Sequence, residues 1–256
     1  MTPQRSAIVV GGASGIGAAI ARALAKTEYL VTVADRDGQA ASSLAAELGP
    51  DHGWAKVEIT HEDQVEALFA SAGDPGPPLH LVVNCVGILA LGMVTEQPVE
   101  KFRRVVDVCL TGSFLVMKHA PDRLQDGGSI ISMSSLNARQ PGVGMGAYCA
   151  AKAGLSMLTE VAALELAPWL RVNAIAPGLI RTPLTSTALG VPGVEADYLE
   201  NIPLGRPGSA EEIAEAVLYL SDAQWITGEV LDLNGGAHMM RYPNVREHYA
   251  RAQNGG

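Results

Sequence analysis

The chain has 256 residues, of which 48% are hydrophobic and 18% are charged, and this balance is typical of a folded globular protein rather than a disordered one. Its formal net charge of -9 argues against nucleic acid as a partner, because a polyanion normally requires a basic face. No apolar run approaches the roughly 18 to 20 residues that span a membrane, and the first residues lead directly into a strand pattern, so we expect a cytoplasmic protein.

Short apolar runs alternate with helical patterns along the whole chain. In chain order, strands are predicted at 6–11, 29–35, 54–59, 79–85, 128–134, 170–176 and 228–233. Helices are predicted between them at 16–26, 38–49, 62–72, 99–121, 147–166 and 210–220. Mostly apolar strands, each followed by a helix, are typical of a parallel sheet covered on both faces. We therefore expect an α/β fold with a Rossmann-type doubly wound sheet, built as a single domain over 1–256.

Two segments stand outside this alternation. Residues 181–209 are rich in Pro, Gly, Ser and Thr and lack a clear period, and loops of that length in compact domains are often lids, so this segment is a candidate substrate lid. The C-terminal tail, residues 237–256, has no pattern that decides between packing on the surface and reaching a neighbouring active site.

The three cysteines, Cys85, Cys109 and Cys149, lie in apolar surroundings and show neither CxxC nor Cys/His spacing. We expect free thiols, with no disulfide framework and no bound metal.

The sequence GGASGIG at 11–17 follows the first predicted strand and opens the first helix. In such a turn Gly11 permits the tight bend, Gly15 lets the backbone approach a pyrophosphate, and Gly17 allows close packing of the helix. Asp35 ends the second strand, where its carboxylate can accept hydrogen bonds from the adenosine ribose and would repel a 2′-phosphate. The pattern predicts a dinucleotide site with NAD preferred over NADP, although Asp35 could merely cap its turn and the adjacent Arg36 could meet a phosphate.

Further motifs follow in order: NCVG at 84–87, Ser135, Tyr148-x-x-x-Lys152, and RVNAIAPGLIRT at 171–182. Together with the glycine motif and Asp35, this series resembles the short-chain dehydrogenase/reductases of the YxxxK type, from Ala7 to about Gly236.

Tyr148 and Lys152 are four residues apart and share one face of a helix. An ammonium beside a phenol stabilises the phenolate, so we expect a lowered pKa for Tyr148 and a role as general acid/base. Ser135, by its separation from Tyr148 in the family, would orient the substrate oxygen, with Ser134 as the second choice. The alternative interpretation is purely structural: the tyrosine packs on its helix, the lysine lies on the surface, and the two serines stand at the end of a strand.

The resemblance also implies which residues hold the cofactor: Asn84 and Gly87 beside it, Glu58 and Ile59 at the adenine, and Lys152 at the nicotinamide ribose. The expected set is Gly11, Ser14, Gly15, Ile16, Gly17, Asp35, Arg36, Glu58, Ile59, Asn84, Gly87, Tyr148, Lys152, Pro177, Gly178, Ile180 and Thr182. The family further implies a homotetramer, with the helices at 99–121 and 147–166 facing a twofold mate.

One departure concerns catalysis. The family's helix-borne asparagine aligns with Cys109, so its side-chain amide is missing here, while the backbone carbonyl could still hold a water. Of the nearby hydroxyls, Thr111 faces another side of the helix and Ser113 lies a turn away, so neither is expected to substitute.

The sequence thus predicts an NAD(H)-dependent oxidoreductase that interconverts a secondary alcohol and a ketone by hydride transfer, with Ser135, Tyr148 and Lys152 as catalytic residues. One alternative is a reductase of carrier-bound 3-oxoacyl groups. Acidic carriers favour a basic docking face, whereas the candidate lid carries Glu195 and Asp197, which favours a small free substrate. Another alternative is a catalytically silent NAD-binding sensor.

Overall fold

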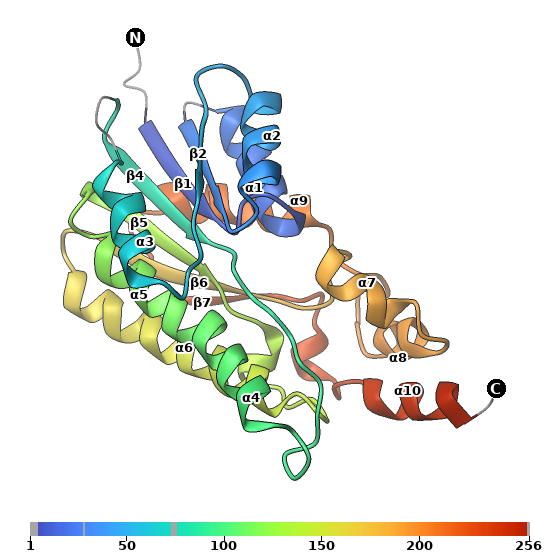
Figure 1. Cartoon of the computed structure of the whole chain (residues 1–256). Coiled ribbons are helices and arrows are strands. Elements are labelled where there is room, and N and C mark those ends of the chain that lie inside the picture. The colour runs from blue at the N-terminus through green and yellow to red at the C-terminus, as the bar shows by residue number, and fades with distance from the viewer. Residues whose placement is uncertain (1–4, 28, 73–75, 255–256) are drawn as a thin grey trace.

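The computed structural model describes residues 5–27, 29–72 and 76–254. One parallel seven-stranded sheet runs through it in the order β3-β2-β1-β4-β5-β6-β7 (Figure 1). The strands are β1 (Arg5–Val10), β2 (Tyr29–Asp35), β3 (Gly53–Lys56), β4 (Leu79–Asn84), β5 (Leu124–Met133), β6 (Arg171–Pro177) and β7 (Val230–Leu233). The predicted doubly wound α/β fold is confirmed.

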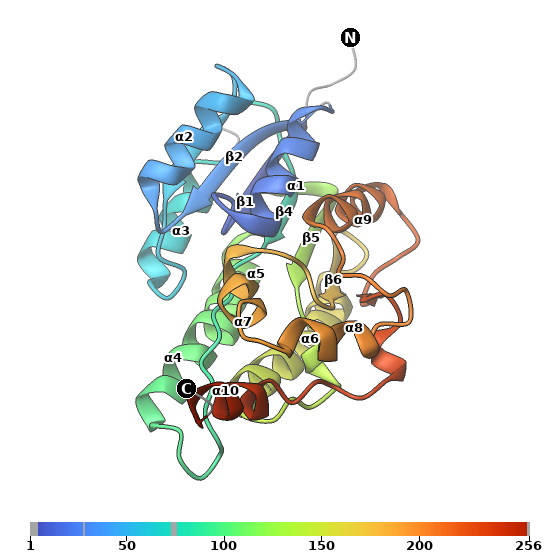
Figure 2. The ribbon, with the colours of Figure 1, turned by 90° about the vertical axis from the view of Figure 1, so that its right-hand side faces the viewer.

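Helices cover both faces of the sheet. One face carries α1 (Gly15–Ala25), α2 (Gly38–Leu48) and α9 (Ala210–Asp222), and the other carries α3 (Glu62–Ala70), α4 (Val99–Val106), α5 (Gly112–His119) and α6 (Gly146–Leu166) (Figures 1 and 2). Every residue of β4 and of β6 is buried, which explains why these strands are mostly apolar and lack the alternation of a strand with one solvent face. The two resulting cores lie above and below the sheet.

Two predicted elements have different bounds in the structure. The helix expected over 99–121 is interrupted between α4 and α5 by a π-helical turn, Asp107–Thr111. Such turns insert a residue that the spacing of apolar residues in the sequence does not reveal. The strand expected over 54–59 ends at Lys56, because β2, with which it pairs, ends at Asp35 opposite Lys56.

The candidate lid and the C-terminal tail both contain helices that were not predicted. The lid segment holds α7 (Pro183–Leu189) and α8 (Val194–Glu200), and the tail holds a short 3₁₀ turn (Ala237–Met239) and α10 (Val245–Asn254). Helices of seven residues span too few turns to show a period of their own. All three α-helices lie beyond the carboxyl ends of the strands, beside one another (Figure 2).

Within the described ranges, none of the helices has the length and apolar character that crossing a membrane requires.

Candidate active site

β1 and β4 lie side by side in the sheet, and the connections that follow their carboxyl ends leave in opposite directions. At such a position α/β sheets commonly bind ligands. The turns after β1, β2 and β4 surround a hollow at this point, which we call the glycine hollow. Its lining residues are Val10, Gly11, Ser14, Asp35, Arg36, Val57, Glu58, Ile59, Cys85, Val86, Gly87, Ile88, Arg104 and Val108.

The glycine-rich turn has the conformation that its sequence requires. Gly11 and Gly15 have φ angles of 73° and 52°, which favour glycine. At Gly17 a Cβ atom would lie 2.1 Å from the Gly11 carbonyl oxygen, so only glycine lets α1 start this close to the turn. The Asp35 carboxylate accepts hydrogen bonds from the backbone N–H of Ala13 at 3.2 Å and of Asp37 at 3.1 Å. These bonds fix the acidic side chain against the turn.

The remaining residues expected at a cofactor lie at the start of α1, beneath the glycine hollow, and in the segment after β6. Besides the hollow-lining residues above, Gly15, Ile16 and Gly17 form the start of α1. Asn84 is buried beneath the hollow, where it accepts a hydrogen bond from the Val86 N–H at 3.1 Å.

The last of the expected cofactor residues come from the segment after β6. Pro177 and Gly178 line a second hollow, Ile180 is buried beneath it, and Thr182 is the N-cap of α7. A Cβ atom on Gly15 would lie 3.5 Å from the Thr182 Cβ, so α7 begins against the glycine turn. The segment therefore joins the two hollows.

This second cavity, the tyrosine hollow, encloses about 790 Å³ including its mouth, and its lining is mostly apolar. It is lined by Leu89, Ser135, Leu136, Asn137, Gln140, Met145, Tyr148, Pro177, Gly178, Leu179, Leu184, Thr185, Ala188, Leu189, Tyr198, Asn201, Ile202, Ala237, Arg241, Tyr242 and Pro243. Ser135 and Tyr148 are thus brought together, while Lys152 lies behind them.

Lys152 is buried in α6, and its Nζ donates a hydrogen bond to the Met133 carbonyl at 2.7 Å. The same Nζ lies 5.8 Å from the centre of the Tyr148 ring. Burial lowers the pKa of Lys152, because an ammonium loses its hydration there.

The expectation of a lowered pKa for Tyr148 is wrong for the chain alone. Burial raises the pKa of the Tyr148 phenol well above its ordinary value, and a hydrogen bond with Ser135 opposes that shift only in part. The lysine ammonium is directed at the Met133 carbonyl instead of the phenol, so desolvation dominates. The phenol is therefore protonated at neutral pH.

The two candidate serines have different surroundings. Ser135 lines the tyrosine hollow, and its Oγ accepts a hydrogen bond from the Asn137 N–H at 3.1 Å. Ser134 faces α6, where its Oγ lies 2.8 Å from the Ser156 Oγ and donates to the Lys152 carbonyl at 3.3 Å. Only Ser135 shares the hollow with Tyr148.

Cys109 lies in the π-helical turn, and its thiol forms hydrogen bonds that the sequence did not predict. Its thiol donates to the Ile88 carbonyl and accepts from the Ile88 N–H, both at 3.4 Å. Its backbone carbonyl accepts a hydrogen bond from the Ser113 Oγ at 3.0 Å, and Asn84 donates to that Oγ at 2.9 Å. The sequence reading that Ser113 is a poor substitute missed this bond, although a Ser four residues after the carbonyl is a common partner for it.

Sequence reasoning also missed Asn137, Gln140, Tyr198 and Tyr242 in the tyrosine hollow. Tyr242 belongs to the C-terminal tail, which therefore lines the hollow of its own chain. No local signal announces such a contact, because the tail and α8 are distant in sequence. Among the residues in the described parts of the chain, no three His, Cys, Asp or Glu side chains are grouped so that they could hold a metal ion.

Comparisons with known proteins agree with this geometry. A family model described as enoyl-(acyl carrier protein) reductase matches residues 11–238. An uncharacterized short-chain type dehydrogenase/reductase of Sinorhizobium fredii is 38% identical over 239 residues, and the match spans 92% of this chain but only 43% of that protein. The 3-oxoacyl-[acyl-carrier-protein] reductase of Mus musculus is 34% identical, with 90% of this chain and 97% of the relative covered. A solved short-chain type dehydrogenase/reductase from Mycobacterium ulcerans superimposes with a TM-score of 0.90 at 33% identity, covering 95% of this chain and 93% of that one.

The Cys109 thiol offers a test that needs no assay of activity. Cys109→Val replaces the thiol by a somewhat larger apolar side chain and leaves the Ile88 N–H and carbonyl without their partner, so the free energy of unfolding should fall by about 1 to 3 kcal/mol. Cys109→Ser, which can make the same two bonds, should lose clearly less. Denaturant unfolding of both variants measures the difference, and a valine variant as stable as the serine variant would show that the thiol bonds contribute nothing.

Proposed function

The chain belongs to the short-chain dehydrogenase/reductase family, and from that premise we propose that this oxidoreductase interconverts a secondary alcohol and a ketone with NAD(H). One observation carries the proposal: Ser135 and Tyr148 share a mostly apolar hollow, with buried Lys152 behind them, next to the glycine turn. This arrangement offers a proton to an oxygen atom in the hollow and excludes bulk water from it.

The residues of the glycine hollow fit a dinucleotide. The turn at Gly11–Gly17 supplies free backbone N–H groups at the start of α1, and the absence of side chains there leaves room for a pyrophosphate. Asp35 would hold the adenosine ribose, and Pro177, Gly178 and Thr182 would border the nicotinamide end. When bound, the nicotinamide would supply or accept the hydride.

In our proposal Tyr148 transfers the proton. Its phenol, protonated at neutral pH, donates to the carbonyl oxygen during reduction and accepts the proton back during oxidation. The Ser135 hydroxyl, which lines the same hollow, positions that oxygen. The nearby Lys152 ammonium stabilises the phenolate that remains after the transfer.

The choice of NAD over NADP rests on two carboxylates. Asp35 and Glu58 both line the glycine hollow, and Asp35 is held in place by two backbone N–H groups. Arg104 lies 3.6 Å from the Glu58 carboxylate, so the positive charge of Arg104 is partly neutralised. Arg36 remains the one lining arginine that could meet a 2′-phosphate, but the fixed carboxylate of Asp35 would lie against the same group.

A reductase of carrier-bound 3-oxoacyl groups is the second candidate, and the Mus musculus relative favours it. The charge argument against it weakens in the structure. Glu195 pairs with Arg181, and Asp197 pairs with Arg241, so these two of the lid's acidic residues do not present free charge. A silent sensor is less favoured, because Ser135 and Tyr148 share the hollow with Lys152 behind them, and a sensor has no need to keep this set.

Assembly into a homotetramer is part of the proposal. Large apolar side chains stand exposed along α5 and α6, where a twofold mate would cover them. They are Phe114, Met157, Val161 and Leu164.

The acid/base role is tested by Tyr148→Phe, which keeps the ring and removes the proton. Turnover of ketones with NADH should fall by about two to four powers of ten, while the affinity for NADH, measured by its fluorescence, should change little. As a matched pair, Ser135→Ala should lose activity and Ser134→Ala should keep it. Near wild-type turnover by Tyr148→Phe would end the mechanism.

Cofactor choice is tested with Asp35→Ala. Wild-type kcat/KM should be higher with NADH than with NADPH, and the substitution should narrow the gap mainly by weakening NADH, because the ribose loses its acceptor. Steady-state kinetics with both cofactors give the result. Equal use of the two cofactors by the wild type would contradict the role given to Asp35.

Assembly is tested by light scattering coupled to gel filtration. The wild type should have the mass of a tetramer at micromolar concentration, and Met157→Asp with Val161→Asp should yield smaller species, because charges would have to be buried in the interface. A monomeric wild type would refute this part of the proposal.

A further inference from the structure

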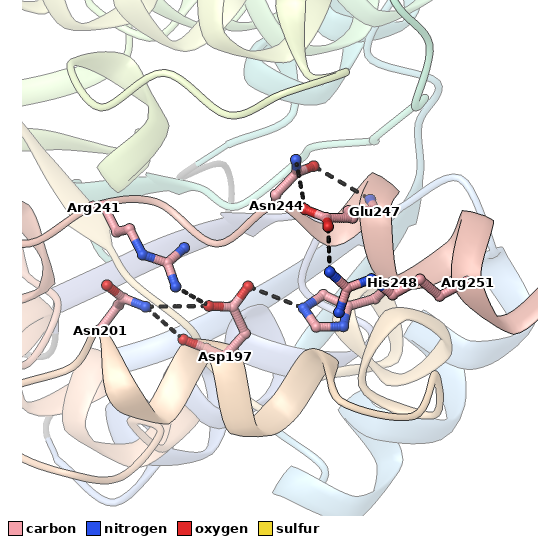
Figure 3. Close-up of polar contacts among 7 residues, drawn as sticks. All are labelled: Asp197, Asn201, Arg241, Asn244, Glu247, His248 and Arg251. Carbon is pink, nitrogen blue, oxygen red and sulfur yellow. Dashed lines mark hydrogen bonds and ion pairs between the residues drawn. The ribbon is translucent and has the colours of Figure 1, made fainter.

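A cluster of charged and polar side chains joins α8 to the C-terminal segment, residues 237–254 (Figure 3). Asp197 of α8 is at its centre, with a side chain that is only 11% exposed. One carboxylate oxygen accepts a hydrogen bond from Arg241 at 2.7 Å, and the other lies 3.0 Å from the Nε2 of His248. Asn201, at the end of α8, donates to the Asp197 carbonyl at 2.7 Å. Both carboxylate oxygens are thus used to hold the C-terminal segment.

The residues next to this ion pair line the tyrosine hollow. Tyr198 follows Asp197, Tyr242 follows Arg241, and the two phenol oxygens lie 2.8 Å apart. Their rings meet edge to face with centres 5.7 Å apart. Burial raises the pKa of both phenols, so both are neutral at neutral pH. The pair forms a wall of the hollow that comes from two segments distant in sequence.

Two further contacts fix the C-terminal segment from other sides. Gln140, five residues beyond Ser135, donates from its Nε2 to the Ala237 carbonyl at 3.1 Å. Arg246 of α10 pairs with Glu96, in the segment between β4 and α4, at 2.9 Å. The wall is therefore tied to the region of the proposed catalytic serine as well as to α8.

The rest of the cluster in Figure 3 lies within α10 and its cap. Glu247 pairs with Arg251 one turn on, and its N–H is hydrogen-bonded by the Asn244 side chain at 3.3 Å. None of these bonds reaches α8. Glu247 therefore offers a control: its carboxylate is on the same helix as His248 but outside the connection to Asp197.

We propose that Tyr198 and Tyr242 are specificity-determining residues that close the tyrosine hollow around a compact apolar substituent, such as an alicyclic ring, and that Asp197 is the positioning residue that holds them together. The inference rests on the proposed function. Its substrate class follows from the hydrophobic cluster to which the two rings belong, in which they pack with Leu179, Leu189 and Ile202; these three side chains also line the hollow and favour an apolar group. The edge-to-face rings and the contacts that hold the C-terminal segment to α8, Gln140 and Glu96 make this wall a fixed one, so we expect a longer or branched substituent to bind less well.

The experiment compares the wild type with Tyr242→Ala, Asp197→Asn and Glu247→Gln, using cyclohexanone and the bulkier 4-tert-butylcyclohexanone with NADH. Tyr242→Ala should raise KM for cyclohexanone with little change in kcat, and should shift the ratio of kcat/KM toward the bulkier ketone by about tenfold or more. Asp197→Asn should also raise KM for cyclohexanone and shift the ratio of kcat/KM toward the bulkier ketone. Glu247→Gln should match the wild type in both KM and this ratio.

Hydrogen exchange of α8 and α10 in the free protein, measured in parallel, needs no turnover. It should be faster in Asp197→Asn than in Glu247→Gln, because only the first variant weakens the bond between the two helices. Equal exchange in both variants, or an unchanged ketone ratio in Tyr242→Ala, overturns the inference while leaving wild-type activity intact. A wild type that reduces no ketone or oxidises no alcohol overturns the proposed function instead, and the selectivity with it.

Discussion

A buried ammonium group is the constraint on which the site depends. Lys152 has lost its hydration, and a charge in that position must be hydrogen-bonded. Its bond to the Met133 carbonyl ties α6 to the end of β5. Tyr148 stands one turn earlier on α6, and Ser135 stands two residues beyond Met133, so this bond, together with those from Ser134 to α6, brings both side chains to the tyrosine hollow. Because β6 pairs with the second half of β5, up to Met133, the segment after Pro177 reaches the same place.

The parts of the fold that could be predicted are those that repeat. Fully buried strands such as β4 and β6 are mostly apolar on both faces, and the helices between the strands are long enough to show a period. The glycine turn and Asp35 were predictable for another reason: a backbone that approaches itself as closely as Gly17 approaches Gly11 allows no other residue. Such local constraints are visible in a sequence.

What could not be predicted depends on contacts between distant segments. Nothing near Tyr242 indicates that it meets Tyr198, and α7 and α8 are too short to show a period. The raised pKa of Tyr148 was missed because spacing shows which residues share a helix face but not how far water is excluded. Ser113 was nearer to prediction, since its distance from the Cys109 carbonyl is the usual one for a back-bonded serine. Its second partner, Asn84, comes from β4 and could only be found in three dimensions.

The most direct test of the central claim, that the Tyr148 phenol carries the proton, is the pH dependence of kcat/KM in both directions. Since burial raises the pKa of this phenol, it keeps its proton through neutral pH. Ketone reduction, which needs the phenol, should therefore be flat near neutrality and fall only in alkaline solution. Alcohol oxidation, which needs the phenolate, should rise with pH across about pH 6 to 10. Both dependences should vanish from the residual activity of Tyr148→Phe. An oxidation rate that does not rise with pH, or one whose rise persists in that variant, would contradict the account.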